Sequence, residues 1–393
     1  MLKKLNIPKG WEKGTVGDLA RGIRGVTFSS EDILSSDEPT AVVLLRSNNI
    51  KDSRINFDEV YLLPSAEVSE DQIARAGDVA VCMSNGSKRL VGKAARLTAV
   101  ELQRKVSVGA FCALFRPTSG ADNNFVPYLF DTESYRRELD ITLAGSAINN
   151  LKNSDIEGIK IPLPPLAEQR KIAEILRTWD EAIETAEAEL KSKQERKQWL
   201  IAKVLKSSSN EAGAVGVKKA PTERLGKLCD ICTGKKDANE GSPDGVYPFF
   251  TCAERHGFSE SYSFDAEAIL VAGNANIGRT NFYKGKFEAY QRTYVLTGFR
   301  GVDVPYLYSL LSARLELDLK NQAQRSAMSY IRLPMLEDYQ IPLPPIAEQR
   351  KIAEIMKCAD LDIGVVDKHL ESLRAQKRGL MQKLLTGEVR VAA

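Results

Sequence analysis

The 393-residue chain has few of the residues on which common catalytic and metal sites depend. It contains only two histidines, His256 and His369, which argues against a hydrolase built on a Ser-His-Asp triad and against a histidine-rich metal site. Its six cysteines are scattered, which fits a reducing compartment better than a disulfide framework. No run approaches the roughly 18 apolar residues of a membrane span, and MLKKLNIPKGWEKG lacks a signal-peptide core, so we expect a cytoplasmic protein.

The motifs of several nucleotide- and cofactor-dependent enzymes are also missing. No G-x-x-x-x-G-K-[ST] phosphate loop occurs, because Ala94 follows Gly92-Lys93 where the motif requires a hydroxyl. Neither G-x-G-x-x-G nor the Asp/Asn-Pro-Pro-aromatic run of amino-methyltransferases is present. We therefore expect this chain to have no catalytic residues and no cofactor of its own.

Two patterns resemble functional sites but have simpler explanations. Cys229 and Cys232 form a C-x-x-C pair, yet no second pair follows at zinc spacing, so we expect a buried strand pair and no metal site. Asp180 and the Glu195-Arg196-Lys197 run are superficially similar to a nuclease pattern of carboxylates and a lysine. All of them fall on one expected helix, so we interpret them as its charge pattern.

An internal repeat organises the chain. The segment IPLPPLAEQRKIAEIL at 161–176 recurs 180 residues later as IPLPPIAEQRKIAEIM at 341–356, with 14 of 16 positions identical. Two copies indicate a duplicated unit, whereas a solenoid would need more. Each copy begins with Pro-Pro, which is tolerated in the first turn of a helix and therefore marks a helix start.

Apolar residues with alternating spacings of four and three follow each Pro-Pro. A seam sustained over four heptads predicts two long helices that pair as a coiled coil. The alternative is two ordinary amphipathic helices packed on separate domains. The expected seam residues are Ile172, Leu176, Trp179, Ile183, Leu190 and Leu200 in the first copy, and Ile352, Met356, Ile363, Val366, Leu370, Leu373, Leu380 and Leu384 in the second.

The length of the connecting segment predicts that the helices run antiparallel. A helix over 166–205 is about 60 Å long. The polar segment KSSSNEAGAVGVKKAP at 206–221 can span only roughly 50 Å, which is too short for a parallel return. We therefore expect an antiparallel coiled coil, with two domains at its opposite ends related by a pseudo-two-fold axis.

Short β-prone runs interleaved with helical pieces occupy the rest of the chain, which predicts an α+β fold with two globular α/β domains. The expected organisation is a first domain at 1–160, a long helix at 161–206, a flexible linker at 207–224, a second domain at 225–340, and a second long helix with the C-terminal tail at 341–393.

Basic residues concentrate in one stretch of each domain, although the net charge is only +3. Positive residues far outnumber acidic ones over 86–116 and over 274–300, as expected where phosphates are neutralised. Duplex DNA has local two-fold symmetry, so a protein with two similar heads suits two half-sites.

Base reading requires Arg, Lys, Asn, Gln, Ser or Thr on exposed loops. The candidate DNA-binding residues of the first domain are Arg46, Ser47, Asn48, Asn49, Asn85, Ser87, Lys88, Arg89, Lys105, Ser146 and Asn149. Those of the second domain are Asn274, Asn276, Arg279, Thr280, Gln291, Arg292, Thr293, Gln324, Arg325 and Ser326.

Four segments of the chain resemble a known family. The two L-P-P-[LI]-A-E-Q-R-K-I-A-E-I blocks, the opening IPKGWEKGTVGDL and the closing LLTGEVRV are similar to the conserved regions of type I restriction-modification specificity subunits. The second half begins APTERLGKLCDI and lacks the tryptophan found at Trp11. The resemblance therefore leaves open how the first strand of the second half is anchored.

The resemblance implies a non-catalytic subunit with two target recognition domains, each reading one half of a bipartite DNA site. It implies that the helices set the gap between half-sites and dock two adenine-methylating modification subunits. It also implies two restriction subunits with motor and nuclease activity. S-adenosylmethionine and ATP with Mg²⁺ would belong to these partners, and the complex would serve defence against foreign DNA.

Two other functions remain open from the residues alone. One is a coiled-coil scaffold protein whose two heads bind proteins or peptides. The other is a self-contained nuclease or methyltransferase.

Overall fold

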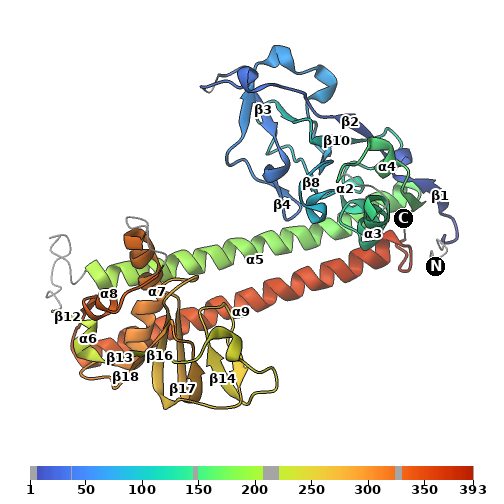
Figure 1. The fold of residues 1–393 in the computed structure, drawn as a ribbon. Helices are drawn as coiled ribbons and strands as arrows, with labels where there is room; N and C mark the ends of the chain where they lie inside the picture. The colour runs from blue at the N-terminus through green and yellow to red at the C-terminus, as the bar shows by residue number, and fades with distance from the viewer. Residues whose placement is uncertain (1–6, 37, 145–148, 207–220, 324–329, 393) are drawn as a thin grey trace. The chain divides into compact units, whose positions relative to one another are not determined.

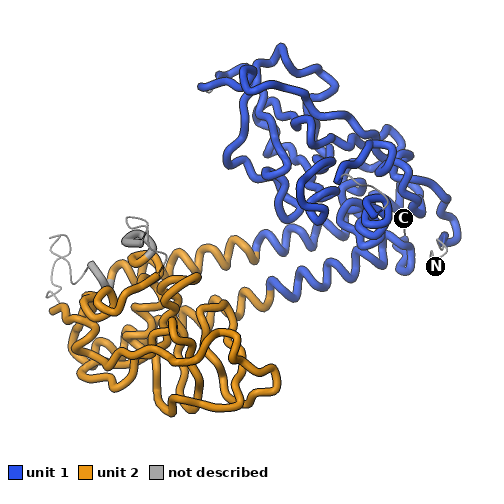
Figure 2. Tube along the Cα trace, in the orientation of Figure 1, with its two compact units in different colours: residues 1–185, 370–393 blue, residues 186–369 orange. Residues whose placement is uncertain are grey.

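A computed structural model describes residues 7–36, 38–144, 149–206, 221–323 and 330–392. The chain divides into two compact units, coloured separately in Figure 2. Unit 1 comprises residues 1–185 and 370–393, and unit 2 comprises residues 186–369. Each unit therefore contains one globular domain and a stretch of both long helices. The boundary between the two units lies inside both long helices, at residues 185–186 and 369–370, and not at the ends of the expected domains.

Unit 1 is built from short strands and helices (Figure 1). Its strands are β1 (Glu12–Thr15), β2 (Ala20–Arg24), β3 (Val42–Leu45), β4 (Ile50–Lys51), β5 (Arg54–Ile55), β6 (Tyr61–Leu63), β7 (Val79–Cys82), β8 (Ala94–Arg96), β9 (Val106–Val108), β10 (Cys112–Pro117) and β11 (Lys160–Leu163). Its helices are α1 (Val16–Leu19), α2 (Val126–Leu129), α3 (Glu133–Ala144), α4 (Asn153–Glu157), the first part of α5 (Leu166–Lys206) and the last part of α9 (Ile346–Leu385).

The central sheet of unit 1 has the order β2-β10-β7-β8 and is antiparallel throughout. A second sheet, β6-β3-β9, pairs β3 with β9 in parallel. The strands of the central sheet are apolar on both faces. Val79 and Val81 of β7 face a core that includes α2, α3 and the long helices, and Ala80 and Cys82 face the second sheet. This explains why the strand sequence VAVC is uninterrupted by polar residues.

Unit 2 has one larger sheet, with the order β13-β18-β16-β17-β14-β15. Its strands are β12 (Thr222–Arg224), β13 (Asp230–Thr233), β14 (Tyr247–Phe250), β15 (Gly257–Ser259), β16 (Phe264–Ala272), β17 (Thr280–Ala289), β18 (Thr293–Thr297) and β19 (Gln340–Pro342). Its helices are α6 (Leu225–Leu228), α7 (Val304–Ala323), α8 (Leu333–Glu337) and the remaining parts of α5 and α9. Ile269 and Val271 of β16 pack with α7, whereas Ala268 and Leu270 face a smaller aromatic core.

The repeated AEQR segment forms the same junction in both units. The Gln169 side chain donates to the carbonyl of Pro164 at 2.9 Å and accepts from the backbone N–H of Asp122 at 3.0 Å. Gln349, 180 residues later, donates to Pro344 at 2.8 Å and accepts from Asp303 at 2.8 Å. Both glutamines are buried, so each anchors the start of a long helix to the domain that precedes it.

The two long helices pair within each unit. In unit 1, Lys377 of α9 contacts Asp180 of α5, and in unit 2, Lys197 of α5 contacts Asp360 of α9. The beginning of each helix thus lies beside the end of the other, and the expected antiparallel pairing is confirmed. These ion pairs contradict the alternative of two unrelated amphipathic helices. They also place Asp180 and Lys197 in the charge pattern of the helices, as expected.

The burial of the expected seam residues fits an apolar contact between the helices. All fourteen expected seam residues are buried or half-buried. In unit 1, Ile172 and Leu176 share one hydrophobic core with Met381 and Leu384. None of the helices in the part of the chain that the structure describes is long and apolar enough to cross a membrane.

The structure gives the bounds of the first long helix and of the strand that follows the expected linker. Helix α5 begins at Leu166 and ends at Lys206, against an expected 166–205. Residues 207–220 of the expected linker lie outside the described residues. Residues 222–224 form β12, which pairs antiparallel with β19 and belongs to unit 2. This pairing is equivalent to that of β1 with β11 in unit 1.

A polar clasp joins the N-terminal strand region of unit 1 to the end of α9. The Glu168 carboxylate accepts from the Trp11 indole N–H at 2.7 Å and from Arg390 at 2.7 and 2.8 Å. The hydrogen bond from Arg390, helped by that from Trp11, holds the pKa of the Glu168 carboxyl below its ordinary value. Gly387, with φ of 68°, turns the chain after α9, and a side chain there would overlap Pro8.

Unit 2 has no such clasp among its described residues, because the residue equivalent to Glu168 is the exposed Glu348. Its first strand β12 instead forms an ion pair through Arg224 with Asp338, next to α8. The first strand of the second half is therefore held by its pairing with β19, with this exposed ion pair beside it.

We expect Glu168→Gln to lower the free energy of unfolding of the protein by about 1.5–3 kcal/mol at neutral pH, because hydrogen bonds to a buried charge are lost. Since the pKa of Glu168 is lowered by folding, its contribution exists above the unfolded-state pKa and disappears as pH falls through the folded-state pKa. The difference between the wild type and the variant should therefore shrink on acidification. Chemical denaturation followed at several pH values measures it.

Glu348→Gln is the matched control, since it changes the equivalent but exposed position of the repeat. It should alter the free energy of unfolding by no more than about 0.5 kcal/mol. Equal losses in the two variants would contradict the role assigned to the clasp.

Candidate nucleic-acid interface

Several candidate residues of unit 1 gather where β7 ends and β10 begins. We call this region the loop edge of unit 1, which comprises residues 47, 84–91, 109–111 and 149–150. Asn85 donates to the Ser47 hydroxyl at 3.3 Å, and its backbone N–H donates to the carbonyl of Asn149 at 3.4 Å. Asn149 in turn donates to the carbonyl of Gly86 at 3.2 Å. Residues from three distant parts of the sequence therefore form one surface.

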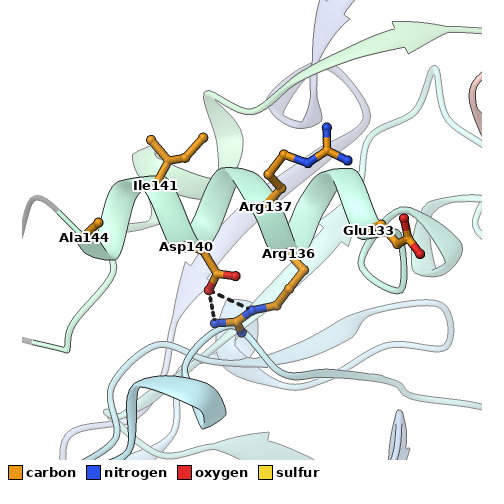
Figure 3. Close-up of a pocket in the computed structure, with 6 residues that line it drawn as sticks. All are labelled: Glu133, Arg136, Arg137, Asp140, Ile141 and Ala144. Atoms are coloured by element: carbon orange, nitrogen blue, oxygen red, sulfur yellow. Dashed lines mark hydrogen bonds and ion pairs between the residues drawn. The ribbon is translucent and has the colours of Figure 1, made fainter. Parts of the chain in front are cut away.

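Helix α3 anchors the backbone of the loop after β7. Arg136 donates to the carbonyl of Val91 at 2.7 Å, and the Tyr135 hydroxyl donates to the carbonyl of Gly92 at 3.0 Å. Arg136 also forms an ion pair with Asp140 on the face of α3 (Figure 3). With its backbone anchored in this way, the loop leaves Lys88 and Arg89 exposed. These residues, with the exposed Ser87, stay predicted phosphate or base contacts.

A similar surface occurs in unit 2 where β16 ends and β18 begins. We call it the loop edge of unit 2, which comprises residues 273–279, 290–292 and 330. Asn274 forms an isolated β-bridge with Tyr330, and Asn276 donates to the carbonyl of Cys252 at 2.9 Å. Gln291 donates to Asp237 at 3.2 Å. Arg292 lies over the Tyr330 ring, 5.6 Å from its centroid.

Four candidate residues have structural roles within their own units. Asn49 is buried and its amide donates to the carbonyls of Asn56 and Asp58 at 2.9 Å each. The Arg46 guanidinium donates to the carbonyl of Glu59 and lies 3.7 Å over the Tyr61 ring. The two remaining residues, Thr280 and Thr293, are buried at the starts of β17 and β18. These side chains therefore have contacts within unit 1 or unit 2, and their contact with bases stays a prediction.

The remaining candidate DNA-binding residues differ in exposure and position. Lys105 is exposed but lies before β9, at the end of that strand away from residues 109–111. Asn48 is exposed beside Ser47, and Arg279 is half-buried at the end of the 273–279 loop. Ser146, Gln324, Arg325 and Ser326 lie outside the described residues.

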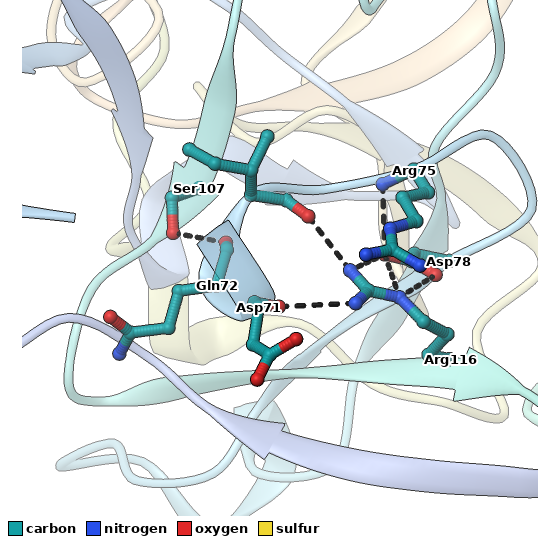
Figure 4. Close-up of polar contacts among 7 residues, drawn as sticks. Asp71, Gln72, Arg75, Asp78, Ser107 and Arg116 are labelled. Carbon is teal, nitrogen blue, oxygen red and sulfur yellow. Dashed lines mark hydrogen bonds and ion pairs between the residues drawn. The ribbon is translucent and has the colours of Figure 1, made fainter. Parts of the chain in front are cut away.

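Much of the positive charge over 86–116 is used inside unit 1. The Arg116 guanidinium forms an ion pair with the buried Asp78 at 2.8 Å and donates to the carbonyls of Asp71 and Ile73 (Figure 4). Arg96 donates to the side chain of Asn124. Counting charges along the sequence therefore overstates the basic surface of this domain. The exposed positive charge of the loop edge lies at Lys88 and Arg89.

Sequence reasoning missed the most exposed aromatic residue of the loop edges. Phe111 has 69% of its surface exposed, although it belongs to the apolar run GAFCALF that we interpreted as a strand. The strand begins one residue later, at Cys112, and Phe111 lies in the preceding turn. The apolar alternation of Phe111, Ala113 and Phe115 gives no signal that the first member leaves the core.

No cluster that could hold a metal ion occurs among the described residues. Cys229 is buried but precedes β13, and Cys232 lies in β13 but is exposed, so the expected buried strand pair is wrong. A hollow beside α3 is lined by Glu133, Arg136, Arg137, Asp140, Ile141 and Ala144 (Figure 3). Because a single helix supplies every lining residue, the hollow is a feature of that helix surface.

Each unit combines an α+β domain that has a polar loop edge with a stretch of both long helices. The chain belongs to the family defined by the type I restriction modification DNA specificity domain, which matches residues 8–193 and again residues 218–372.

Individual relatives agree with this assignment. The chain is 33% identical over 184 residues to the type I restriction enzyme StySPI specificity subunit of Salmonella potsdam, covering 47% of this chain and 39% of that protein. It is 35% identical over 172 residues to the EcoKI specificity subunit of Escherichia coli, covering 44% and 36%. The chain thus spans less than half the length of these relatives. It is 25% identical to the MjaVIII specificity subunit of Methanocaldococcus jannaschii, covering 98% of this chain and 95% of that protein.

Two solved structures share the fold. The S subunit of a type I restriction-modification system from M. genitalium superposes with a TM-score of 0.60 at 18% identity, covering 98% of both chains. A chain from a study of complex assembly and conformational transition of the type I R-M system gives a TM-score of 0.57 at 17% identity, covering 98% of this chain and 100% of that one.

We expect Arg116→Ala to lower the free energy of unfolding by about 3–5 kcal/mol, because the buried Asp78 carboxylate loses its partner. Lys88→Ala should change it by no more than about 0.5 kcal/mol, since Lys88 is exposed. Chemical denaturation of both variants measures the two effects. Similar stabilities would show that the Arg116 charge is not part of the core of unit 1.

Proposed function

We propose that this chain is the non-catalytic DNA recognition subunit of a type I restriction-modification complex, in which each unit reads one half of a bipartite duplex site. One observation carries the proposal: both units present exposed polar and basic side chains on loops at one end of a central sheet, as direct readout of base edges requires. Membership of the DNA specificity family supports the same conclusion.

The proposal extends to partners. The paired helices set the gap between half-sites and dock two methyltransferase subunits. Ile355, Leu361 and Val365 of α9, exposed by 51%, 61% and 68%, support docking, because exposed apolar side chains on one helix suit a protein partner. Two restriction subunits complete the complex in the cytoplasm. S-adenosylmethionine and ATP with Mg²⁺ act in the partner subunits.

Salt-dependent binding to duplex DNA separates this function from that of a protein-binding scaffold. We expect the affinity of the full chain for its duplex site to fall roughly a hundredfold or more between 50 and 200 mM salt, because phosphate contacts release counterions. Lys88→Gln should reduce the slope of log affinity against log salt by about one. Lys171→Gln is the control, because Lys171 pairs with Glu174 on α5. A slope near zero for the wild type would favour the scaffold.

The length of the paired helices should determine the gap between half-sites. Seven residues inserted after Thr185 and seven before Leu370 lengthen both helices by one heptad, or about 10 Å. We expect the preferred gap to increase by about 3 base pairs, since each adds about 3.4 Å. Selection of binding sites from a randomised duplex pool measures the gap.

Seven residues inserted between Asn210 and Glu211 add the same length outside the two helices, and this control should leave the gap unchanged. A constant gap in the helix-lengthened protein would contradict the proposed spacing role.

A further inference from the structure

The same tight turn precedes the central strand of both units. In unit 1, the backbone N–H of Cys112 donates to the carbonyl of Gly109 at 2.8 Å, closing a four-residue turn before β10. In unit 2, the N–H of Thr293 donates to the carbonyl of Tyr290 at 2.8 Å, closing an equivalent turn before β18. Phe111 and Arg292 therefore occupy the same third position of the two turns.

The surroundings of the two turns are equivalent as well. The carbonyl of Phe111 accepts from the N–H of Met83 at 2.8 Å, just after β7, and the carbonyl of Arg292 accepts from Gly273 at 2.9 Å, just after β16. On the other side, the N–H of Gly25 donates to Cys112 at 3.1 Å, and that of Gly234 donates to Thr293 at 3.2 Å. A Cβ on either glycine would overlap the turn backbone, so the close approach requires glycine at both places.

A third segment completes each surface in the same way. Ser84 forms an isolated bridge with Asn150 in unit 1, and Asn274 forms one with Tyr330 in unit 2. The N–H of Leu151 then donates to Met83 at 2.8 Å, and the N–H of Ile331 donates to Gly273 at 2.8 Å. The backbone around both turn residues is thus fixed by neighbouring segments, while their side chains are free to differ.

The two side chains present different chemistry at this shared position. The Phe111 ring is 69% exposed beside the polar side chains of the loop edge, although a large aromatic residue is normally buried. The Arg292 side chain is exposed and lies against Tyr330, itself 40% exposed. None of the described carboxylates forms an ion pair with Arg292. Stacking on an aromatic ring pre-orients a guanidinium and leaves its N–H groups at the edge available.

We propose that this turn residue is the base-reading position of each unit: Phe111 contacts the methyl group of a thymine in one half-site, and Arg292 donates to a guanine in the other. The inference rests on the proposed DNA recognition function. An aromatic or aliphatic side chain discriminates thymine through its C5 methyl, and arginine discriminates guanine through bidentate hydrogen bonds to O6 and N7. Tyr330 acts as a positioning residue for Arg292.

The test is selection of binding sites from a randomised duplex pool by the full-length wild type, Phe111→Ala, Arg292→Ala and Arg292→Lys. The wild type should prefer thymine at one position of the first half-site and guanine at one position of the second. Phe111→Ala should reduce the thymine preference about tenfold and leave the second half-site unchanged. Arg292→Ala should abolish the guanine preference alone. Arg292→Lys keeps the charge but loses the planar fork, so it should also lose most of that preference.

Two exposed residues away from the turns serve as matched controls. Val100, 76% exposed, follows β8 at the opposite end of the central sheet of unit 1, because β8 runs antiparallel to β7. Arg300 follows β18 at the end away from Arg292 and pairs with Asp230. Val100→Ala and Arg300→Ala should leave both half-sites unchanged. Melting temperatures close to that of the wild type should show that all of these variants fold.

The outcomes distinguish the inference from the function on which it rests. A wild type that selects a bipartite site, with unchanged base preferences in Phe111→Ala and Arg292→Ala, would overturn the inference and keep the proposed function. A loss of affinity without a change of preference at any single position would also overturn it, since the residues would then contribute without reading bases. A wild type that shows no salt-dependent duplex binding would overturn both.

Discussion

Unit 1 depends on the antiparallel contact between the two long helices. The core of unit 1 is formed by the first domain together with Ile172 and Leu176 from α5, and with Met381 and Leu384 from the far end of the chain. Removing this contact would expose apolar side chains of three elements at once. The Glu168 clasp adds a polar connection on the same side of unit 1, where Arg390 and Trp11 meet. The first domain therefore shares its core with both long helices, whereas the core of the second, among the described residues, includes residues of α9 but none of α5.

The two units share backbone contacts but differ in the side chains on their loop edges. The buried glutamine after each Pro-Pro, the strand pair beside each helix start and the tight turn before each central strand recur with matching hydrogen bonds. The side chains on the loop edges do not recur: a phenylalanine in one unit corresponds to an arginine in the other. This pattern is expected where the backbone supplies a fixed position and the side chain supplies specificity.

The long helices could be predicted well from the sequence because their signal is repeated many times. Fourteen apolar positions with heptad spacing, two Pro-Pro starts and a short connection together define the helix limits and their antiparallel pairing. The limits of α5 differ from the expectation by one residue. The sequence also indicated that the basic stretches of the two halves correspond, and each stretch does contain the loop after β7 or β16 and the turn before β10 or β18.

The individual residues of the candidate interface could be predicted only in part. Asn49 and Asn85 are both asparagines in polar segments. Asn49 is buried and its amide donates to two backbone carbonyls, whereas Asn85 is half-buried on the loop edge. The difference arises from pairing between distant segments, which leaves no periodic pattern in the sequence. Arg116 is indistinguishable from a surface arginine until Asp78 is placed beside it. Phe111 is missed because it belongs to an apolar run that predicts a strand, whereas it lies in the turn before that strand and is exposed.

The charge pairs of the helices have one more consequence. Asp180 and Lys197 lie on the same helix, as do Asp360 and Lys377, so each helix carries both members of the pair that it makes with the other. These two pairs are therefore self-complementary, whereas the pair of Lys193 with Asp362 has no counterpart because Ala182 and Leu373 occupy the equivalent positions. Joining two repeats in one polypeptide keeps these pairs and allows the two domains to differ, which the proposed reading of two different half-sites requires.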